Sequence, residues 1–268
     1  MPFGLKNAGA TYQRLVNHMF HPQIEWNVEV YIDDMLVKSL DEGKHLHDLQ
    51  ETFDTLRQYN MKLNPSKCAF RVSSGKFFGF IVSYRGIEAN PDKIQATLDM
   101  KPPQSIKEVQ SLIGQIVALN RFVSKATDKC LLFFKVLKKI FEWMDECQKA
   151  FQDLKTYLIT TPLLSLSVLG EELYLYLAVT PHALSSTLIR EEGRVQKLVY
   201  YTSRALRGAK GRYLLIEKLA FALITTSRKL RHYFQAHVIN VMTNHHLKKA
   251  MNKLEGLLSS VSLTSGTN

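Results

Sequence analysis

The sequence predicts an α+β fold in which short β-hairpins are followed by a helical middle segment and then by a mixed α/β part. Three observations support this class. Apolar residues alternate on both sides of two adjacent acids in VEVYIDDMLVK, residues 28–38, as in a strand, a tight turn and a second strand. Between residues 105 and 158, apolar residues recur at the three- and four-residue spacing of helices. Strand-like alternation returns in ELYLYLAV, residues 172–179.

The N-terminal elements can be placed from apolar spacing and from turn residues. The opening MPFGLKNAG is a loop rich in Pro and Gly, and a helix is expected over residues 10–20, where apolar side chains form one stripe. After the acidic hairpin we expect a helix over residues 41–59 and a turn in LNPSK. KFFGFIVS and RGIEAN, residues 76–83 and 85–90, predict two strands, and Pro91 is expected to close this unit.

A helical segment is expected after the Pro-Pro pair at residues 102–103, which is the clearest linker in the chain. Ser105 and Glu108 have the spacing of a capping box at the start of its first helix. Apolar spacing predicts two further helices, over residues 130–140 and 147–158.

The C-terminal part is expected to mix strands with one long helix. Strands are predicted in ELYLYLAV, in LVYYTS (residues 198–203) and in VINVMT (residues 238–243), and a helix over residues 216–230. The change from helical to strand-like pattern places a domain boundary near residues 160–170.

Charge and composition restrict the classes of function. Lys and Arg number 35 against 24 Asp and Glu, which gives a net charge of +11 and favours a polyanionic partner, either nucleic acid or an acidic membrane surface. No run of about 18 apolar residues and no signal peptide is present, so we expect no membrane span and an intracellular protein of the cytoplasm or nucleus. The 3 cysteines form no CxxC pair, which fits a reducing compartment. Nothing in the sequence predicts the oligomeric state.

The acidic pair itself allows two interpretations. Adjacent carboxylates repel, and this raises the pKa of at least one of them unless a cation or a hydrogen-bond donor compensates. A bound divalent metal is the strongest such compensation. Aspartate is also a common residue of ordinary solvated turns, so these residues alone do not decide between metal ligation and a plain turn.

Five segments occur in an order and spacing that together carry a family resemblance: MPFGLKNAGATYQR, YIDDMLV, LNPSKCAF, FFGFIVS and RGIEANPDKI. This combination resembles the reverse transcriptase in the Pol polyprotein of gypsy-type long-terminal-repeat retrotransposons, over roughly residues 1–250. The segments NAGATYQR, EELYLYLAV, YYTSRALRGA and RKLRHYFQAH look most like a plant lineage of these elements.

The resemblance implies roles for individual residues. It makes Asp33 a ligand of Mg²⁺ and Asp34 its less direct partner, and it places Lys67 near the leaving phosphate. It places six residues near the incoming nucleotide, the template and the primer end: Pro2, Phe3, Gly4, Gln13, Tyr31 and Met35. Four residues match the hairpin that grips the primer: Phe77, Phe78, Gly79 and Phe80.

Some of these residues also have ordinary structural interpretations. Taken alone, Lys67 fits a solvated turn lysine, and the Phe-rich hairpin fits plain hydrophobic core. Gly9 stands where many members of the family have proline, which is a mild departure from the family pattern.

The resemblance also implies partners and a domain order. The partners are an RNA template and a DNA primer, held as an RNA/DNA hybrid, and a deoxynucleoside triphosphate in the complete enzyme. Residues 1–100 correspond to a partial palm, residues 101–165 to the thumb and connection, and residues 166–268 to a truncated, degenerate RNase H-like domain. The family takes another metal-binding aspartate from a strand upstream of MPFGL, and the fingers also lie there. We therefore expect no polymerase activity from this chain alone.

The C-terminal part lacks the acids of the family's nuclease. From residue 154 to residue 268 the sequence contains no aspartate. Alignment by motif puts Ala178, Leu219 and Asn244 at the positions of the catalytic acids. RNase H activity, which needs acidic ligands for two metal ions, is therefore expected to be absent.

Binding without chemistry is the alternative function. Between residues 193 and 253 there are thirteen Lys or Arg and a single acid, Glu217. This imbalance suits a phosphate backbone, but it also fits a solvated basic face. A non-catalytic nucleic-acid-binding remnant and a pseudogene product with no selected role therefore remain alternatives to a reverse transcriptase fragment.

Overall fold

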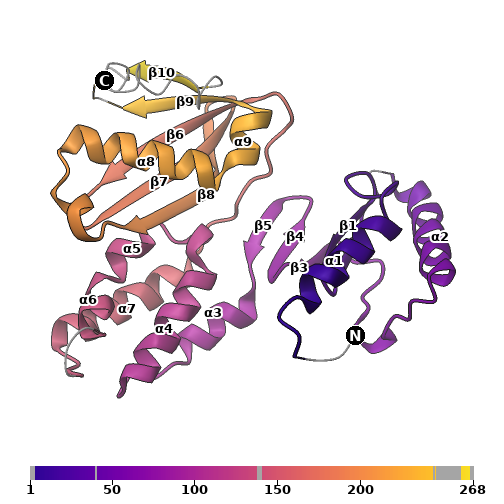
Figure 1. Ribbon diagram of the computed structural model, residues 1–268, viewed down its shortest axis with the longest axis horizontal. Helices are drawn as coiled ribbons and strands as arrows, with labels where there is room; N and C mark the ends of the chain where they lie inside the picture. The colour runs from indigo at the N-terminus through magenta and orange to yellow at the C-terminus, as the bar shows by residue number, and fades with distance from the viewer. Residues whose placement is uncertain (1–3, 40, 138–140, 244, 246–260, 266–268) are drawn as a thin grey trace. The chain divides into compact units, whose positions relative to one another are not determined.

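The computed structural model describes residues 4–39, 41–137, 141–243, 245 and 261–265. Helices and strands alternate through these residues, which confirms the α+β class (Figure 1). The chain divides into two compact units, Met1–Tyr84 and Arg85–Asn268. None of the helices described has the length and hydrophobicity that crossing a bilayer requires.

The first unit packs two helices against the acidic hairpin. Its elements are α1 (Ala8–Met19), β1 (Val28–Tyr31), β2 (Asp34–Val37), α2 (Glu42–Gln58), the 3-10 turn η1 (Pro65–Lys67), β3 (Ser74–Phe77) and β4 (Phe80–Ser83). The expected helices over residues 10–20 and 41–59 are therefore confirmed to within two residues at each end. The stripe of α1 buries Val16, Met19 and Phe20 against Val28 of β1 and Leu56 of α2. This core fixes the first strand of the hairpin to both helices.

The segment KFFGFIVS is not one strand, as the sequence suggested, but a hairpin. Phe78 and Gly79 both have positive φ, +54° and +73°, and they form a two-residue turn between the paired residues Phe77 and Phe80. Positive φ at both central positions is the pattern of a type I′ turn, whose twist matches that of antiparallel strands. A non-glycine residue in this conformation gives no sign in the apolar pattern, so the turn was missed.

The second unit begins with β5 (Gly86–Ala89) and α3 (Pro91–Leu98). The strand ends at Ala89, just before Pro91 as expected, and Pro91 is the first residue of the helix. The Asn90 side chain caps this helix by accepting a hydrogen bond from the Asp92 N–H at 3.0 Å. Proline suits this position because the first helical N–H has no partner within the helix and the ring already sets a helical φ.

Helices form the middle of this unit: α4 (Ile106–Ala118), the 3-10 turn η2 (Asn120–Phe122), α5 (Ala126–Lys129), α6 (Leu131–Val136) and α7 (Asp145–Ile159). Ser105 caps α4 as expected, and the Glu108 carboxylate accepts the Gln104 N–H at 2.6 Å. The helix expected over residues 130–140 is shorter and ends at Val136, and residues 138–140 lie outside the described residues.

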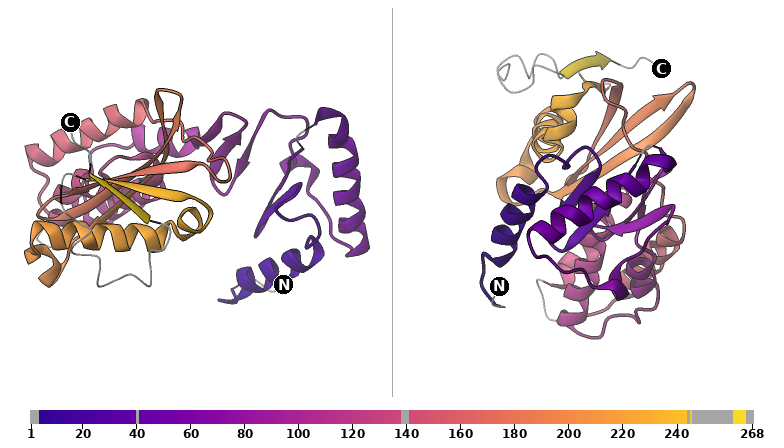
Figure 2. Two further views of the ribbon diagram at one scale, coloured as in Figure 1. Left: turned by 90° about the horizontal axis from the view of Figure 1, so that it is seen from above. Right: turned by 90° about the vertical axis from the view of Figure 1, so that its right-hand side faces the viewer.

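A five-stranded sheet follows in the order β10-β9-β6-β7-β8. Its strands are β6 (Glu172–Val179), β7 (Ala183–Glu192), β8 (Val195–Ala205), β9 (Val238–Thr243) and β10 (Val261–Ser265). Strands β6, β7 and β8 are antiparallel neighbours, whereas β9 runs parallel to β6 and β10 parallel to β9. Helix α8 (Leu215–Lys229) runs along one face of the sheet, and α9 (Arg231–Ala236) follows it (Figures 1 and 2).

Strand β7 has no counterpart among the strands that the sequence predicted. Its buried positions include Ser185 and Ser186, where an apolar pattern would have shown a strand. The Ser186 hydroxyl lies 2.6 Å from that of Thr202 on β8 and 2.9 Å from that of Thr226 on α8. Because these hydroxyls satisfy one another, the interior of the unit accepts them without the cost of an unpaired polar group.

Gly86 marks a close approach of two backbones. Its neighbour Ile87 exchanges both backbone hydrogen bonds with the buried Leu164, at 2.8 and 2.9 Å. Gly86 has φ of +138°, and a Cβ atom there would lie 2.1 Å from the Leu164 carbonyl oxygen. Only glycine fits this backbone and this gap.

Gly86→Ala is therefore predicted to destabilise the protein by roughly 2 kcal/mol or more, since backbone strain and the clash with Leu164 add. Urea denaturation of the 268-residue chain measures the change. Gly114→Ala is the matched control, because Gly114 lies within α4 with no atom within 4 Å of an added Cβ. There we expect a gain of about 0.5–1 kcal/mol. Equal midpoints for Gly86→Ala and the unmodified chain would contradict the prediction.

Candidate active site

The acidic hairpin has a tight, strained turn. Tyr31 and Asp34 are the last paired residues of β1 and β2, so Ile32 and Asp33 alone form the turn. Ile32 has φ of +47°, the pattern of a type II′ turn, in which the first central residue is normally glycine. A β-branched residue in this region is a true outlier that costs about 1–3 kcal/mol, and such strain concentrates at functional sites. Asp33 and Asp34 are both exposed at this tip.

Gln13 of α1 holds the strained turn in place. Its side-chain oxygen accepts the Ile32 N–H at 2.6 Å, and its side-chain nitrogen donates to the Val30 carbonyl at 3.2 Å. The same nitrogen lies 2.8 Å from Asn17 Oδ1, one helical turn further along α1. The family resemblance associates Gln13 with template and nucleotide contact, which stays a prediction; its amide is engaged with the hairpin.

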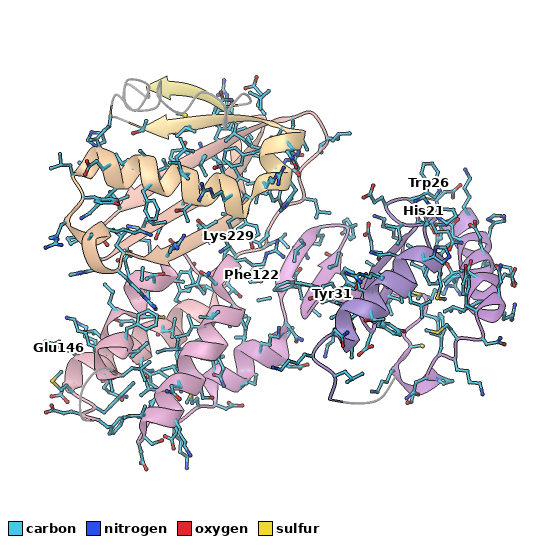
Figure 3. All side chains as sticks on the ribbon, viewed as in Figure 1. His21, Trp26, Tyr31, Phe122, Glu146 and Lys229 are labelled. Atoms are coloured by element: carbon cyan, nitrogen blue, oxygen red, sulfur yellow. The ribbon has the colours of Figure 1, made fainter. Side chains whose placement is uncertain are left out.

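The turn between β3 and β4 meets the acidic hairpin. The Phe78 N–H donates to Asp34 Oδ2 at 3.2 Å, and the Phe78 ring packs edge-on against the Tyr31 ring with centroids 4.1 Å apart. Tyr31, labelled in Figure 3, is the last residue of β1. The structure thus brings together two segments that the sequence singled out separately, across 44 residues of chain. Local patterns carry no signal for this contact.

Burial and charge also link α1 to the turn. The pKa of Tyr12 is raised, chiefly by burial and further by the negative charge of Asp33. Met35, which the resemblance places near the nucleotide, is half-buried and packs against the core formed by α1 and α2.

Two further predicted site residues, Lys67 and Gly4, lie within the described part of the chain. Lys67 ends η1 and is exposed, and within the described residues no hydrogen bond or ion pair joins it to Asp33 or Asp34. Gly4 has φ of +96° with open space around it, which suits a backbone that another molecule approaches. Pro2 and Phe3 lie outside the described residues.

The acid pair fits a divalent cation only in part. Carboxylate oxygens are the ligands that Mg²⁺ prefers, and Asp33 and Asp34 present them at an exposed tip. In the part of the chain that is described, the one group of three ligand-type side chains within 4.8 Å of one another is His47, Asp48 and Glu51 on α2. Among the described residues, no third ligand-type side chain therefore lies within this distance of both Asp33 and Asp34. The Ser39 hydroxyl donates a hydrogen bond to Asp48, and this bond is the main cause of the lowered pKa of Asp48. Asp48 therefore anchors the loop before α2.

The positions aligned with the nuclease acids carry no carboxylate in the structure. Ala178 lies in β6 opposite Ser185 of β7, and Leu219 is a core residue of α8 with 4% of its surface exposed. Asn244 lies outside the described residues. The nearby acid Glu217 accepts the Leu214 N–H at 2.8 Å, so it caps α8.

Basic and aromatic side chains meet where the helical segment reaches the sheet. The Arg121 guanidinium lies 4.6 Å from the Tyr200 ring centroid, and the Lys229 ammonium lies 5.8 Å from the same ring. Figure 3 labels Lys229 at the C-terminal end of α8. Its pKa is lowered, first by burial and then by the charge of Arg121. Tyr200 and Tyr233 pack against the core of the sheet.

Two segments of the chain match known protein families. Residues 1–82 match the reverse transcriptase (RNA-dependent DNA polymerase) family, and residues 143–241 match the RNase H-like domain found in reverse transcriptase. The Pol polyprotein from transposon 297 of Drosophila melanogaster is 30% identical over 248 residues, which are 91% of this chain and 23% of the relative. The Tf2-3 polyprotein of Schizosaccharomyces pombe is 25% identical over 251 residues, 91% of this chain and 19% of the relative.

Solved structures show the same fold. The foamy viral protease-reverse transcriptase in complex with RNA/DNA hybrid has a TM-score of 0.85 at 17% identity, over 100% of this chain and 39% of that chain. Its complex with dsDNA has a TM-score of 0.81 at 17% identity, over 100% of this chain and 60% of that chain. This chain spans about a quarter or less of the length of the two transposon polyproteins. The chain is therefore similar over most of its length to transposon Pol polyproteins, with one segment that matches the reverse transcriptase family and a later one that matches the RNase H-like domain.

Proposed function

We propose that this chain is part of the reverse transcriptase of a gypsy-type retrotransposon of plant-like lineage. In the complete enzyme it would take part in template-directed DNA synthesis on an RNA template from a DNA primer. The observation that carries the proposal is the contact of the Phe78 turn with Tyr31 and Asp34, inside a segment that matches the reverse transcriptase family. This contact supports a proposal in which the acidic tip and the turn at Phe78 act together on a primer end.

The proposed division of labour follows the resemblance. Residues 1–100 are a partial palm, residues 101–165 the thumb and connection, and residues 166–268 a degenerate RNase H-like domain. Asp33 is the principal metal ligand, and Phe77 to Phe80 hold the primer end. Mg²⁺ bound at this tip would activate the primer 3′-hydroxyl and stabilise the departing pyrophosphate of a deoxynucleoside triphosphate.

We infer that the chain alone does not polymerise. One adjacent pair of carboxylates supplies too few oxygens to hold two Mg²⁺ ions in octahedral geometry. A reverse transcriptase fragment that still binds nucleic acid is therefore the state that we propose for the isolated chain. The net charge of +11 supports binding to phosphates, and the structural neighbours were solved with RNA/DNA hybrid and with dsDNA.

The chain is predicted to bind a primer annealed to an RNA template without extending it. Because phosphate contacts release counterions, the affinity should fall roughly tenfold or more between about 50 mM and about 200 mM salt. Filter binding at several salt concentrations measures the affinity, and primer extension with Mg²⁺ and deoxynucleoside triphosphates measures synthesis. Asp33→Asn should bind as tightly or slightly more tightly, since it removes a negative charge near phosphates.

Two results would count against this proposal. Extension that disappears in Asp33→Asn would show that the chain has a more complete catalytic site than the acid pair indicates. A lack of hybrid binding at low salt, by a chain with a normal melting transition, would leave no nucleic-acid function for the fragment.

Restoring the nuclease acid at Leu219 is predicted to damage the fold. Leu219→Glu places a carboxylate in the core, and we expect a loss of roughly 3 kcal/mol in the free energy of unfolding. Burial raises the pKa of the introduced carboxyl, so the loss should be smaller at about pH 5 than at about pH 8. Urea denaturation at the two pH values measures both effects.

Leu215→Glu is the matched control for this change. Leu215 lies on the same helix with 51% of its surface exposed, and an acid in the first turn is favourable there. A Leu219→Glu chain as stable as this control would show that the site accepts a carboxylate. Neither variant should cleave the RNA strand of a hybrid.

A further inference from the structure

The turn between β3 and β4 contacts one cross-strand pair of the acidic hairpin, Tyr31 and Asp34. Tyr31 and Asp34 face each other at the end of β1 and β2, directly before and after the two turn residues. Two contacts of Phe78 go to this pair, from the ring to Tyr31 and from the N–H to Asp34. The turn is therefore attached at the base of the loop that displays Asp33.

Phe78 needs such an attachment because its own conformation is unfavourable. Its φ of +54° is one that L residues with side chains rarely adopt, and the neighbouring Gly79 has φ of +73°. Phe78 is also an exposed aromatic residue, with 47% of its surface accessible. Contacts from β1 and β2 therefore compensate a backbone that local preferences do not favour.

The two acids differ in what they contact. Asp34 Oδ2 accepts a backbone N–H, and a hydrogen bond from an N–H to an ionised carboxylate is stronger than one between neutral groups. Asp33 lies in the turn itself, and no hydrogen bond from the described residues reaches its carboxylate. A carboxylate has two oxygens, so Asp34 keeps Oδ1 for another partner while Oδ2 holds Phe78.

We propose that Asp34 is a positioning residue that fixes the Phe78–Gly79 turn to the acidic hairpin and so sets the distance between a bound primer end and Asp33. This inference rests on the proposed role of the Phe77 to Phe80 turn in primer contact. It assigns Asp34 a function that does not depend on metal. The Asp34 oxygen that accepts the Phe78 N–H holds the turn, and the negative charge of Asp34 only strengthens this hydrogen bond.

The pair Asp34→Asn and Asp34→Ala separates the acceptor from the charge. Asparagine keeps an oxygen that can accept the Phe78 N–H, and alanine does not. Amide hydrogen exchange at Phe78, followed by NMR in the full chain without divalent metal, is the first readout. Exchange should rise roughly fivefold or more in Asp34→Ala and less than about twofold in Asp34→Asn. Asp33→Asn should leave exchange at Phe78 unchanged.

Hybrid affinity in EDTA is the second readout. Asp34→Ala should bind a primer annealed to an RNA template roughly threefold to tenfold more weakly than Asp34→Asn, because its turn is free to move. Equal exchange and equal affinity for the two variants would overturn the proposal, since charge or metal binding would then be the only role of Asp34. Failure of the unmodified chain to bind the hybrid would instead refute primer contact, and the exchange experiment would still decide whether Asp34 holds the turn.

Discussion

The hydrogen bond from the Ile32 N–H to Gln13 is the constraint on which the acidic tip depends. It holds a β-branched residue in a left-handed conformation that the chain would otherwise avoid. Gln13 can reach the turn because it lies on the side of α1 that carries the buried Val16 and Phe20, which packs against the hairpin. Gly9, the departure from the family pattern, lies one turn earlier, and a Cβ there would make an ordinary contact 3.7 Å from the Ile32 side chain. The helix thus comes near the turn at Gly9 and holds it through the Gln13 side chain.

The second unit shows that basic residues also serve the fold. The Lys155 ammonium donates to the carbonyls of Leu98 and Met100, both at 2.6 Å, where α3 ends. Lys129 donates to the Ser124 carbonyl at 3.0 Å and lies 3.8 Å from the Tyr157 ring centroid. These ammonium groups are hydrogen-bonded to backbone carbonyls and are therefore less free to contact phosphates. A count of Lys and Arg thus overstates the positive charge that is available to a phosphate backbone.

Sequence patterns located the elements better than the contacts between them. The helices and the acidic hairpin follow from apolar spacing because one face of each is buried. Strand β7 was missed because hydroxyls satisfied by Thr202 and Thr226 occupy its buried positions. The turn at Phe78 was missed because its conformation is maintained by Tyr31 and Asp34, far away in the sequence. A local pattern cannot report a conformation that distant residues stabilise.

The two segments that match known families differ in what the side chains at their predicted acidic positions contact. In the part that matches the RNase H-like domain, Leu219, which the resemblance aligns with a nuclease acid, lies in a core, and Glu217 caps a helix, so both side chains stabilise the fold. In the reverse transcriptase part, an unfavourable turn still displays Asp33, and a second unfavourable turn is fixed beside it through Asp34. Such strain persists only where surrounding contacts enforce it, and here Gln13, Tyr31 and Asp34 do so. The unfavourable conformations of Ile32 and Phe78 are therefore explained by contacts with Gln13, Tyr31 and Asp34 and not by local backbone preferences.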